Sequence, residues 1–154
     1  MEQKTKVNAE EGKQEILITR EFDLPLALLF KAYTDPDIVE QWMGTKVLKL
    51  ECKKHGSFQF ETTIPEGKKL GFNGVIHDFR PNQKIIRTFE IENSPFGVQL
   101  EVLEFEKLTD GSSKLNKQVI YQSVKQRDEN LKLPFKQGIN LAHNCLQEVV
   151  NKIK

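Results

Sequence analysis

The hydrophobic pattern at the end of the chain predicts a long helix. From residue 135 onward, apolar side chains recur every three or four residues, the period of one helical face, with mostly polar residues between them. Pro134 suits the first turn of a helix, where a missing N–H costs nothing. We therefore predict a helix over about 134–153, preceded by a shorter turn in which Ser123 and Gln126 have the spacing of a capping box. The apolar stripe of the long helix comprises Phe135, Ile139, Ala142, Leu146, Val149, Val150 and Ile153.

Two short helices are predicted in the first third of the chain. Pro25 opens the first, in which apolar residues follow helical spacing. Asp35 and Pro36 end it and start the second, because Asp is a favoured N-cap and Pro fits the first helical position. This second helix should cover about 36–42, and Gly44 after it fits a C-terminal cap.

The remaining segments show the period of strands. Short turn-forming sequences such as Pro65-Glu66-Gly67 and Asp110-Gly111 separate them, so neighbouring strands should pair antiparallel as a meander. The seven predicted strands are 15–22, 46–53, 57–64, 70–79, 84–92, 98–107 and 114–122.

One of these strands changes phase. Val98, Leu100 and Val102 alternate cleanly with polar residues, and the apolar series then continues at Leu103 and Phe105. A β-bulge inserts one residue and shifts the phase of a strand. We therefore predict a bulge near Val102–Leu103, which would also bend the sheet.

These elements predict an α+β fold with a curved antiparallel sheet. Its apolar face needs a cover, and the long C-terminal helix has the matching stripe. We expect residues 15–154 to form a single domain. Residues 1–14 carry almost no apolar content and should be a mobile tail. A curved sheet around one helix often leaves space that side chains do not fill, and such a space is a natural ligand site.

Composition narrows the classes of function. The chain has 23 Lys and Arg residues against 22 Asp and Glu residues, which argues against nucleic acid and membrane surfaces as partners. No apolar run reaches transmembrane length and the N-terminus lacks a signal-peptide core, so we expect a cytoplasmic protein, a monomer or a homodimer. Cys52 and Cys145 are too few for a disulfide scaffold and should be free, buried thiols.

Candidate catalytic and metal-binding residues are sparse. The histidines His55, His77 and His143 lack the spacing of a zinc site, and no nucleophile motif or Gly-rich phosphate loop occurs. We therefore expect no metal and no cofactor, and the pattern favours a protein that is not an enzyme. His143 lies at the edge of the apolar stripe. There it is either a polar group that hydrogen-bonds a ligand inside a cavity or, as the favoured interpretation, a boundary residue half in water.

Four short motifs lie within residues 18–44: Arg20-Glu21-Phe22, Phe30-Lys31-Ala32, Thr34-Asp35-Pro36, and Gln41-Trp42 followed by Gly44. This stretch resembles the opening of the family named for the activator of the heat shock protein 90 ATPase. That family belongs to the START-like (SRPBCC), birch-pollen-allergen-like helix-grip superfamily. Weaker similarity at Gly74, Pro81 and Gly138 extends the resemblance over about 15–153. Met43 and Thr45 depart from it, because the family commonly has Trp and Pro there.

The resemblance implies a helix-grip fold and leaves three functions open. The leading hypothesis is non-enzymatic binding of a hydrophobic or amphipathic small molecule between the curved sheet and the long helix. The alternatives are a chaperone-regulating interaction module, with a role in stress response, that uses the outer sheet surface, and a small enzyme of the cyclase or dehydratase kind that uses His143 or His77.

The expected ligand site combines apolar side chains with a few polar ones. His143, Tyr121 and Arg87 are the candidates to orient the polar end of the ligand. Trp42 and Met43 could equally gate the pocket or fill the core. The residues expected to line the site are Trp42, Met43, Phe58, Phe60, Phe72, Phe89, Tyr121, Phe135, Ile139, Ala142 and His143.

Overall fold

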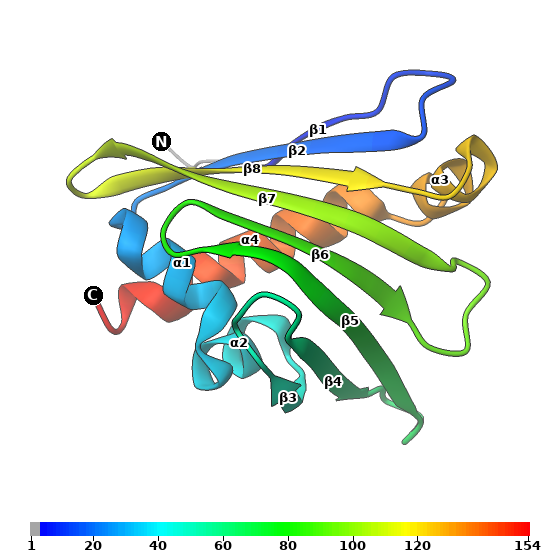
Figure 1. Cartoon of the computed structure of the whole chain (residues 1–154), viewed down its shortest axis with the longest axis horizontal. Helices are drawn as coiled ribbons and strands as arrows, with labels where there is room; N and C mark the ends of the chain where they lie inside the picture. Colours follow the sequence, from blue (N-terminus) through cyan, green and yellow to red (C-terminus); the bar gives the residue numbers. More distant parts are fainter. Residues whose placement is uncertain (1–3) are drawn as a thin grey trace.

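The computed structural model describes residues 4–154, in which one antiparallel sheet curves around a long helix (Figure 1). The sheet has eight strands in the order β1-β2-β8-β7-β6-β5-β4-β3, so the segment from β3 to β8 is a meander and β2 closes onto β8. The strands are β1 (Lys6–Asn8), β2 (Glu15–Phe22), β3 (Lys46–Leu50), β4 (Ser57–Thr63), β5 (Lys69–Arg80), β6 (Lys84–Ile91), β7 (Val98–Thr109) and β8 (Ser112–Ile120).

Within residues 4–154, four helices complete the fold: α1 (Leu26–Thr34), α2 (Pro36–Met43), α3 (Val124–Leu131) and α4 (Phe135–Asn151). The predicted caps are confirmed. The Asp35 carboxylate accepts hydrogen bonds from the N–H groups of residues 37 and 38, and the Ser123 hydroxyl accepts one from the Gln126 N–H. Gly44 ends α2 with φ 63°, a left-handed conformation that glycine adopts without strain.

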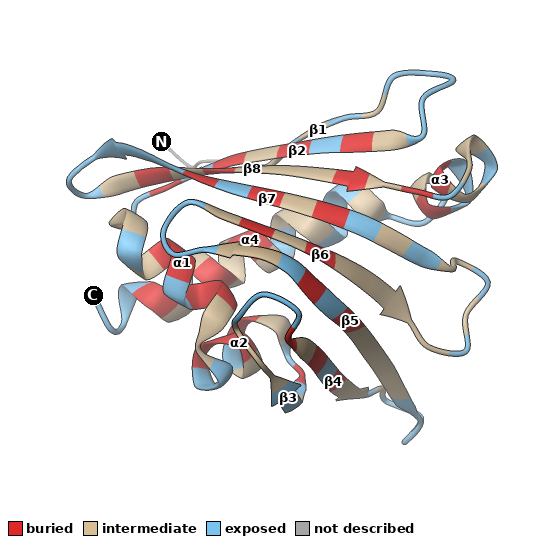
Figure 2. Ribbon diagram, in the orientation of Figure 1, coloured by how far each residue is buried: buried red, intermediate tan, exposed pale blue. Residues whose placement is uncertain are grey.

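The long helix α4 covers the inner, concave face of the sheet unevenly. In Figure 1, α4 passes behind the sheet, with α1 and α2 beside its C-terminal half and α3 at its start. Its fully buried residues are His143, Leu146 and Val150, all in the second half. In the first half, Phe135 and Ile139 are only partly buried (Figure 2). The predicted α+β helix-grip fold is confirmed, with its tightest packing at one end of α4.

The structure corrects one predicted detail and adds one. The pairing of β7 with β6 and β8 runs without interruption through Val102 and Leu103, so the bulge predicted there is wrong. The bulge of β7 lies between Lys107 and Thr109. Within the segment predicted as a tail, β1 pairs with β2. Val7 of β1 also packs against the apolar side chains of β2 and β8, but a strand of three residues is too short for its side-chain pattern to predict it.

The core consists of two apolar clusters on the inner face. The larger one gathers α1, α2, the aromatic residues of β4 to β6 and the C-terminal half of α4. The smaller one lies on β2 and β8, where Ile16, Ile18, Val119 and Tyr121 pack against Phe135 and Ile139. On β8, Leu115 belongs to the larger cluster and Val119 to the smaller one, so Lys117 lies between them.

Gly74 of β5 lies at a close approach between β5, β6 and the Phe58 ring. A Cβ atom there would collide with the Thr88 carbonyl oxygen and with the Phe58 ring. We expect Gly74→Ala to lower the free energy of unfolding by roughly 1–3 kcal/mol, measured by urea denaturation, because the surrounding backbone and ring must shift. Gly111→Ala is the matched control, since nothing lies near its added methyl group. Equal stability of both variants would contradict this account.

Candidate functional site

The middle of the inner face is charged. Along β7 the inward series is Gln99, Glu101, Leu103 and Phe105, while Val98 and Leu100 are exposed on the outer face. Glu101 pairs with Arg87 of β6, and Leu103 pairs with Lys117 of β8. Because paired residues share a face of the sheet, the side chains of Arg87, Glu101 and Lys117 point inward together.

Arg87, Glu101 and Lys117 form what we term the charged cluster. Arg87 Nε donates to Glu101 Oε1 at 2.9 Å, and Lys117 Nζ lies 3.3 Å from Glu101 Oε2. Gln99 Nε2 also donates to Oε2, at 2.7 Å. Arg87 is 6% exposed and Glu101 is 2% exposed. Two cationic side chains thus share one buried carboxylate.

Electrostatics in the charged cluster follow from burial and from these contacts. Burial alone would raise the pKa of Glu101, but Lys117, Arg87 and the hydrogen bonds from Arg87 and Gln99 lower it to about 2. Burial lowers the pKa of Lys117, and Glu101 opposes that effect. Burial raises the pKa of Tyr33, whose hydroxyl also senses the charges of Arg87 and Glu101. Glu101 is therefore ionised throughout the physiological range.

Aromatic rings border the charged cluster on β4, β5 and β6. The Arg87 guanidinium carbon lies 5.2 Å from the ring centroid of Phe58 and 5.7 Å from that of Phe89. Phe58 contacts Phe60 at a centroid distance of 5.1 Å, and Phe89 contacts Phe72 at 5.6 Å. Phe58 and Phe60 are buried, whereas Phe72 and Phe89 are only partly buried. A guanidinium beside a partly buried ring such as Phe89 suits the junction between the polar end and the apolar body of a ligand.

The first half of α4 faces this region with apolar side chains that are not fully covered. Ala142 packs against the larger cluster, and Phe135 and Ile139 pack against the smaller one. All three are partly buried. Tyr121 is 4% exposed, and burial, with the nearby Glu101 charge, raises the pKa of its hydroxyl. The structure therefore distributes the predicted lining residues over both apolar clusters, on either side of the charged cluster.

His143 is more buried than we expected. It is 1% exposed, so the interpretation as a boundary residue half in water is wrong. Its Nδ1 lies 2.7 Å from the Thr5 hydroxyl, and its ring packs edge-to-face with Phe22 at a centroid distance of 5.6 Å. Burial, with the charges of Lys117 and Arg20, lowers the pKa of His143 to about 3. The imidazole is neutral at physiological pH, which leaves it able to orient a ligand but not to exchange protons there.

Trp42 and Met43 differ in their surroundings. The indole N–H of Trp42 donates to the Ala32 carbonyl at 2.7 Å, and its ring packs on Tyr33 at a centroid distance of 5.2 Å. Trp42 is 8% exposed, while Met43 is partly buried at the edge of the larger cluster. This geometry favours the core role for Trp42 over a gating role.

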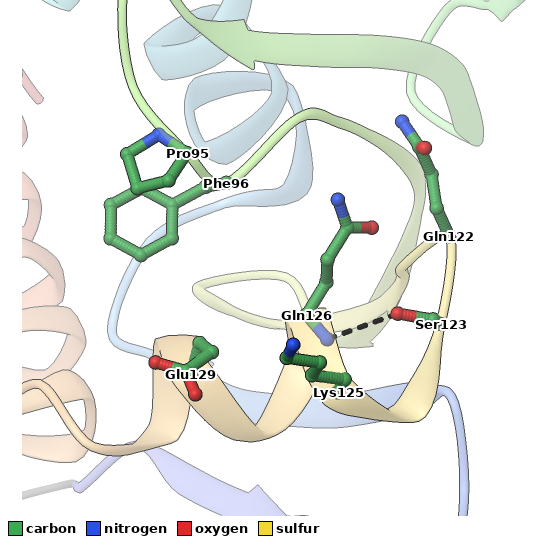
Figure 3. A pocket seen from close by; sticks show the side chains of 7 residues that line it. All are labelled: Pro95, Phe96, Gln122, Ser123, Lys125, Gln126 and Glu129. Atoms are coloured by element: carbon green, nitrogen blue, oxygen red, sulfur yellow. Dashed lines mark hydrogen bonds between the residues drawn. The ribbon is translucent and has the colours of Figure 1, made fainter.

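A pocket opens at the end of the fold where α4 begins (Figure 3). Its volume is about 730 Å³, within the usual range for small-molecule sites. The pocket lies between the β6–β7 loop and the start of α3. Figure 3 shows the Phe96 ring above α3 and the Gln126 side chain pointing toward the loop. Its lining residues are Pro95, Phe96, Gln122, Ser123, Lys125, Gln126 and Glu129.

Other candidate chemistry lies away from this region. Within residues 4–154, no group of three or more His, Cys, Asp or Glu side chains could hold a metal ion. His55 and His77 are exposed on the outer side, with ring centroids 6.5 Å apart. Cys52 and Cys145 are both free thiols, as predicted, and are partly rather than fully buried. No helix in the described part of the chain is long and apolar enough to cross a membrane.

Sequence reasoning found the aromatic residues and Arg87 but missed Glu101, Lys117 and Gln99. A signal for them existed in the phase change of β7, which was attributed to a bulge. When apolar residues switch faces without a bulge, polar residues must occupy the inner face, here Gln99 and Glu101.

Comparison with known proteins supports the fold and leaves the ligand open. The family model described as Activator of Hsp90 ATPase homolog 1-like protein matches residues 23–151. A crystal structure of a protein from Rhodobacter sphaeroides is similar, with a TM-score of 0.87 and 20% identity, over 97% of this chain and 99% of that one.

Two further solved structures show the same fold. A solution structure of a protein from Arthrobacter aurescens has a TM-score of 0.85 and 16% identity, over 96% of this chain and 91% of that one. Protein Ms6760 from Mycobacterium smegmatis has a TM-score of 0.80 and 21% identity, over 95% of this chain and 96% of that one. No curated protein matches the sequence.

Proposed function

The chain belongs to the family of Activator of Hsp90 ATPase homolog 1-like proteins, and within that fold we propose that it binds a hydrophobic or amphipathic small molecule between the inner face of the sheet and α4. The observation that carries this proposal is the position of the charged cluster beside Phe89, whose ring is only partly buried and contacts the partly buried Phe72. A core built only for stability would bury Phe72, Phe89 and Ile139 fully, because burying apolar surface stabilises the folded state by about 25 cal/mol per Å².

The pocket between the β6–β7 loop and α3 supports the same proposal. It lies at the end of the fold where α3 precedes the start of α4 (Figures 1 and 3). A ligand of this protein would have to enter at this end, because α1 and α2 pack against the opposite end of the inner face. We propose that this pocket is the entrance to the binding site.

Native mass spectrometry of the purified protein is the direct test. An added mass that disappears on denaturation would support the proposal, and its value would identify the ligand. A bare mass, combined with no binding of a neutral apolar dye such as N-phenyl-1-naphthylamine, would contradict it.

Ala142 offers a mutational test of where the ligand lies. Ala142→Trp should fill the space beside the larger cluster and weaken dye binding at least tenfold, measured by fluorescence titration. Leu141→Trp is the matched control, because Leu141 is 65% exposed on another face of α4. Unchanged affinity in Ala142→Trp would contradict the placement of the ligand under α4.

A second candidate function has its own observation. The outer face of the sheet carries exposed apolar residues, among them Leu17 at 42%, Val98 at 39% and Leu100 at 36% exposure. Apolar residues on an outer sheet face favour contact with a protein partner. The name of the matching family makes a chaperone one such partner. Stimulation of a chaperone ATPase by the purified protein would favour this interaction module over the binding of a small molecule.

A further inference from the structure

Arg87 has more hydrogen-bonding capacity than the protein uses. Only its Nε has an acceptor among residues 4–154, the Oε1 atom of Glu101. A guanidinium carries four further N–H groups on its two terminal nitrogens. In the same part of the chain, neither terminal nitrogen of Arg87 is among the fully enclosed side-chain atoms that lack a hydrogen-bond partner. The terminal nitrogens of Arg87 are therefore not sealed by packing, although the residue is 6% exposed. They keep some contact with solvent and have no acceptor within residues 4–154.

Glu101 cannot supply the missing acceptors. Its Oε1 atom accepts from Arg87, and its Oε2 atom faces both Gln99 and Lys117. Two cationic side chains thus share one carboxylate whose oxygens are already engaged. A buried cation without full compensation is costly, so the charged cluster has room for one more negative charge.

Building on the proposed function, we infer that the polar end of the ligand is an organic anion, such as a carboxylate, bound by the terminal nitrogens of Arg87 with Lys117 beside it. The planar guanidinium fork matches two carboxylate oxygens, which a single ammonium does not. The rings of Phe58 and Phe89 lie next to the guanidinium, so the apolar body of the ligand would begin where its anionic end stops. The chemical class is an amphipathic acid of the fatty-acid kind.

Competition between two matched ligands tests this inference. Decanoate and decanol have the same chain and differ in the charge of the polar end, and each would displace N-phenyl-1-naphthylamine from the protein at about pH 7.5, where the carboxylate is ionised. A purely apolar site would bind decanol more tightly than decanoate, because transferring the neutral molecule out of water costs less free energy. We expect decanoate to bind at least about tenfold more tightly than decanol, because hydrogen bonds to charged groups are the stronger ones.

Variants then assign the preference to particular residues. Arg87→Gln should abolish the preference for decanoate and leave the binding of decanol in place. Lys117→Met should reduce the preference for decanoate while keeping the contact between Arg87 and Glu101. If Arg87→Gln does not fold, Lys117→Met therefore still tests whether the charged cluster binds the anion. Lys69→Met removes an exposed lysine that lies away from the charged cluster and should change neither ligand.

The outcomes separate this inference from the proposal on which it rests. If the dye does not bind and neither ligand does, the proposed function fails and the inference falls with it. If the dye binds and decanol competes as well as decanoate, only the inference is overturned. A preference for decanoate that survives in both Arg87→Gln and Lys117→Met also overturns it, because the anion is then bound elsewhere.

Discussion

Glu101→Gln is expected to lower the free energy of unfolding by roughly 3–5 kcal/mol, measured by urea denaturation near neutral pH. The substitution keeps the shape of the side chain and removes the only carboxylate that contacts Arg87 and Lys117 among residues 4–154. Both cations then stay in the interior without a counter-charge. Removing one partner of a buried ion pair costs more than a lost hydrogen bond, since the remaining charge is left uncompensated.

Two further variants make this expectation specific. Glu104→Gln removes an exposed carboxylate from the same strand and should change stability by no more than about 0.5 kcal/mol. Lys117→Met, combined with Glu101→Gln, should recover part of the loss, because only one uncompensated cation remains. A double-mutant cycle measures that coupling. If Glu101→Gln is no more destabilising than Glu104→Gln, the charged cluster does not stabilise the fold in the way described.

The fold was predictable because its local signals agree with one another. The Asp35 and Ser123 caps and the Gly44 C-cap are all determined within a few residues, and each lies where predicted. The long helix was visible from its apolar stripe alone. Such features depend on short-range chemistry, which the sequence displays directly.

The candidate site was only partly predictable because it depends on pairing between distant strands. Arg87, Glu101 and Lys117 come from three strands, and their meeting is determined by sheet register, which no local pattern specifies. On the apolar side, Phe58 and Phe89 were found because a large aromatic residue on an alternating strand signals the inner face wherever it occurs. A charged residue is normally assigned to the solvent-facing side of a strand. An inward Glu is recognised only when the alternation of the neighbouring residues places it on the inner face.

His143 shows the same limitation on a helix. Its place at the edge of the apolar stripe did not reveal that Thr5, from the far end of the chain, covers it. Helical periodicity shows which side of α4 faces the protein, but not which other segments pack there. Burial at 1% exposure follows from that long-range contact and makes His143 a measurable contributor to stability.

The stability of this protein should fall on mild acidification, and His143 should be the main cause. Its pKa is lowered from 6.5 to about 3 in the folded state, first by burial and then by the charges of Lys117 and Arg20. Below about pH 6.5 the unfolded chain therefore binds a proton that the folded chain refuses. The free energy of unfolding then decreases as the pH falls toward 3, at up to about 1.36 kcal/mol per pH unit.

Glu101 does not obscure this effect above pH 5. Its pKa is lowered from 4.5 to about 2, so its contribution to stability is complete above about pH 4.5 and is lost only as the pH falls from there toward 2. Between pH 8 and pH 5 we expect the wild-type protein to lose roughly 2 kcal/mol, measured by urea unfolding at each pH. His143→Gln, which retains a polar group near Thr5, should remove most of that dependence.

His77→Gln is the matched control for the acid effect, because His77 is exposed on the outer side of the sheet. It should leave the pH dependence as in the wild-type protein. The same slope in His143→Gln and wild type would mean that His143 gains its proton in the folded state as readily as in the unfolded one. That result would contradict a neutral imidazole enclosed by Thr5, Phe22 and α4.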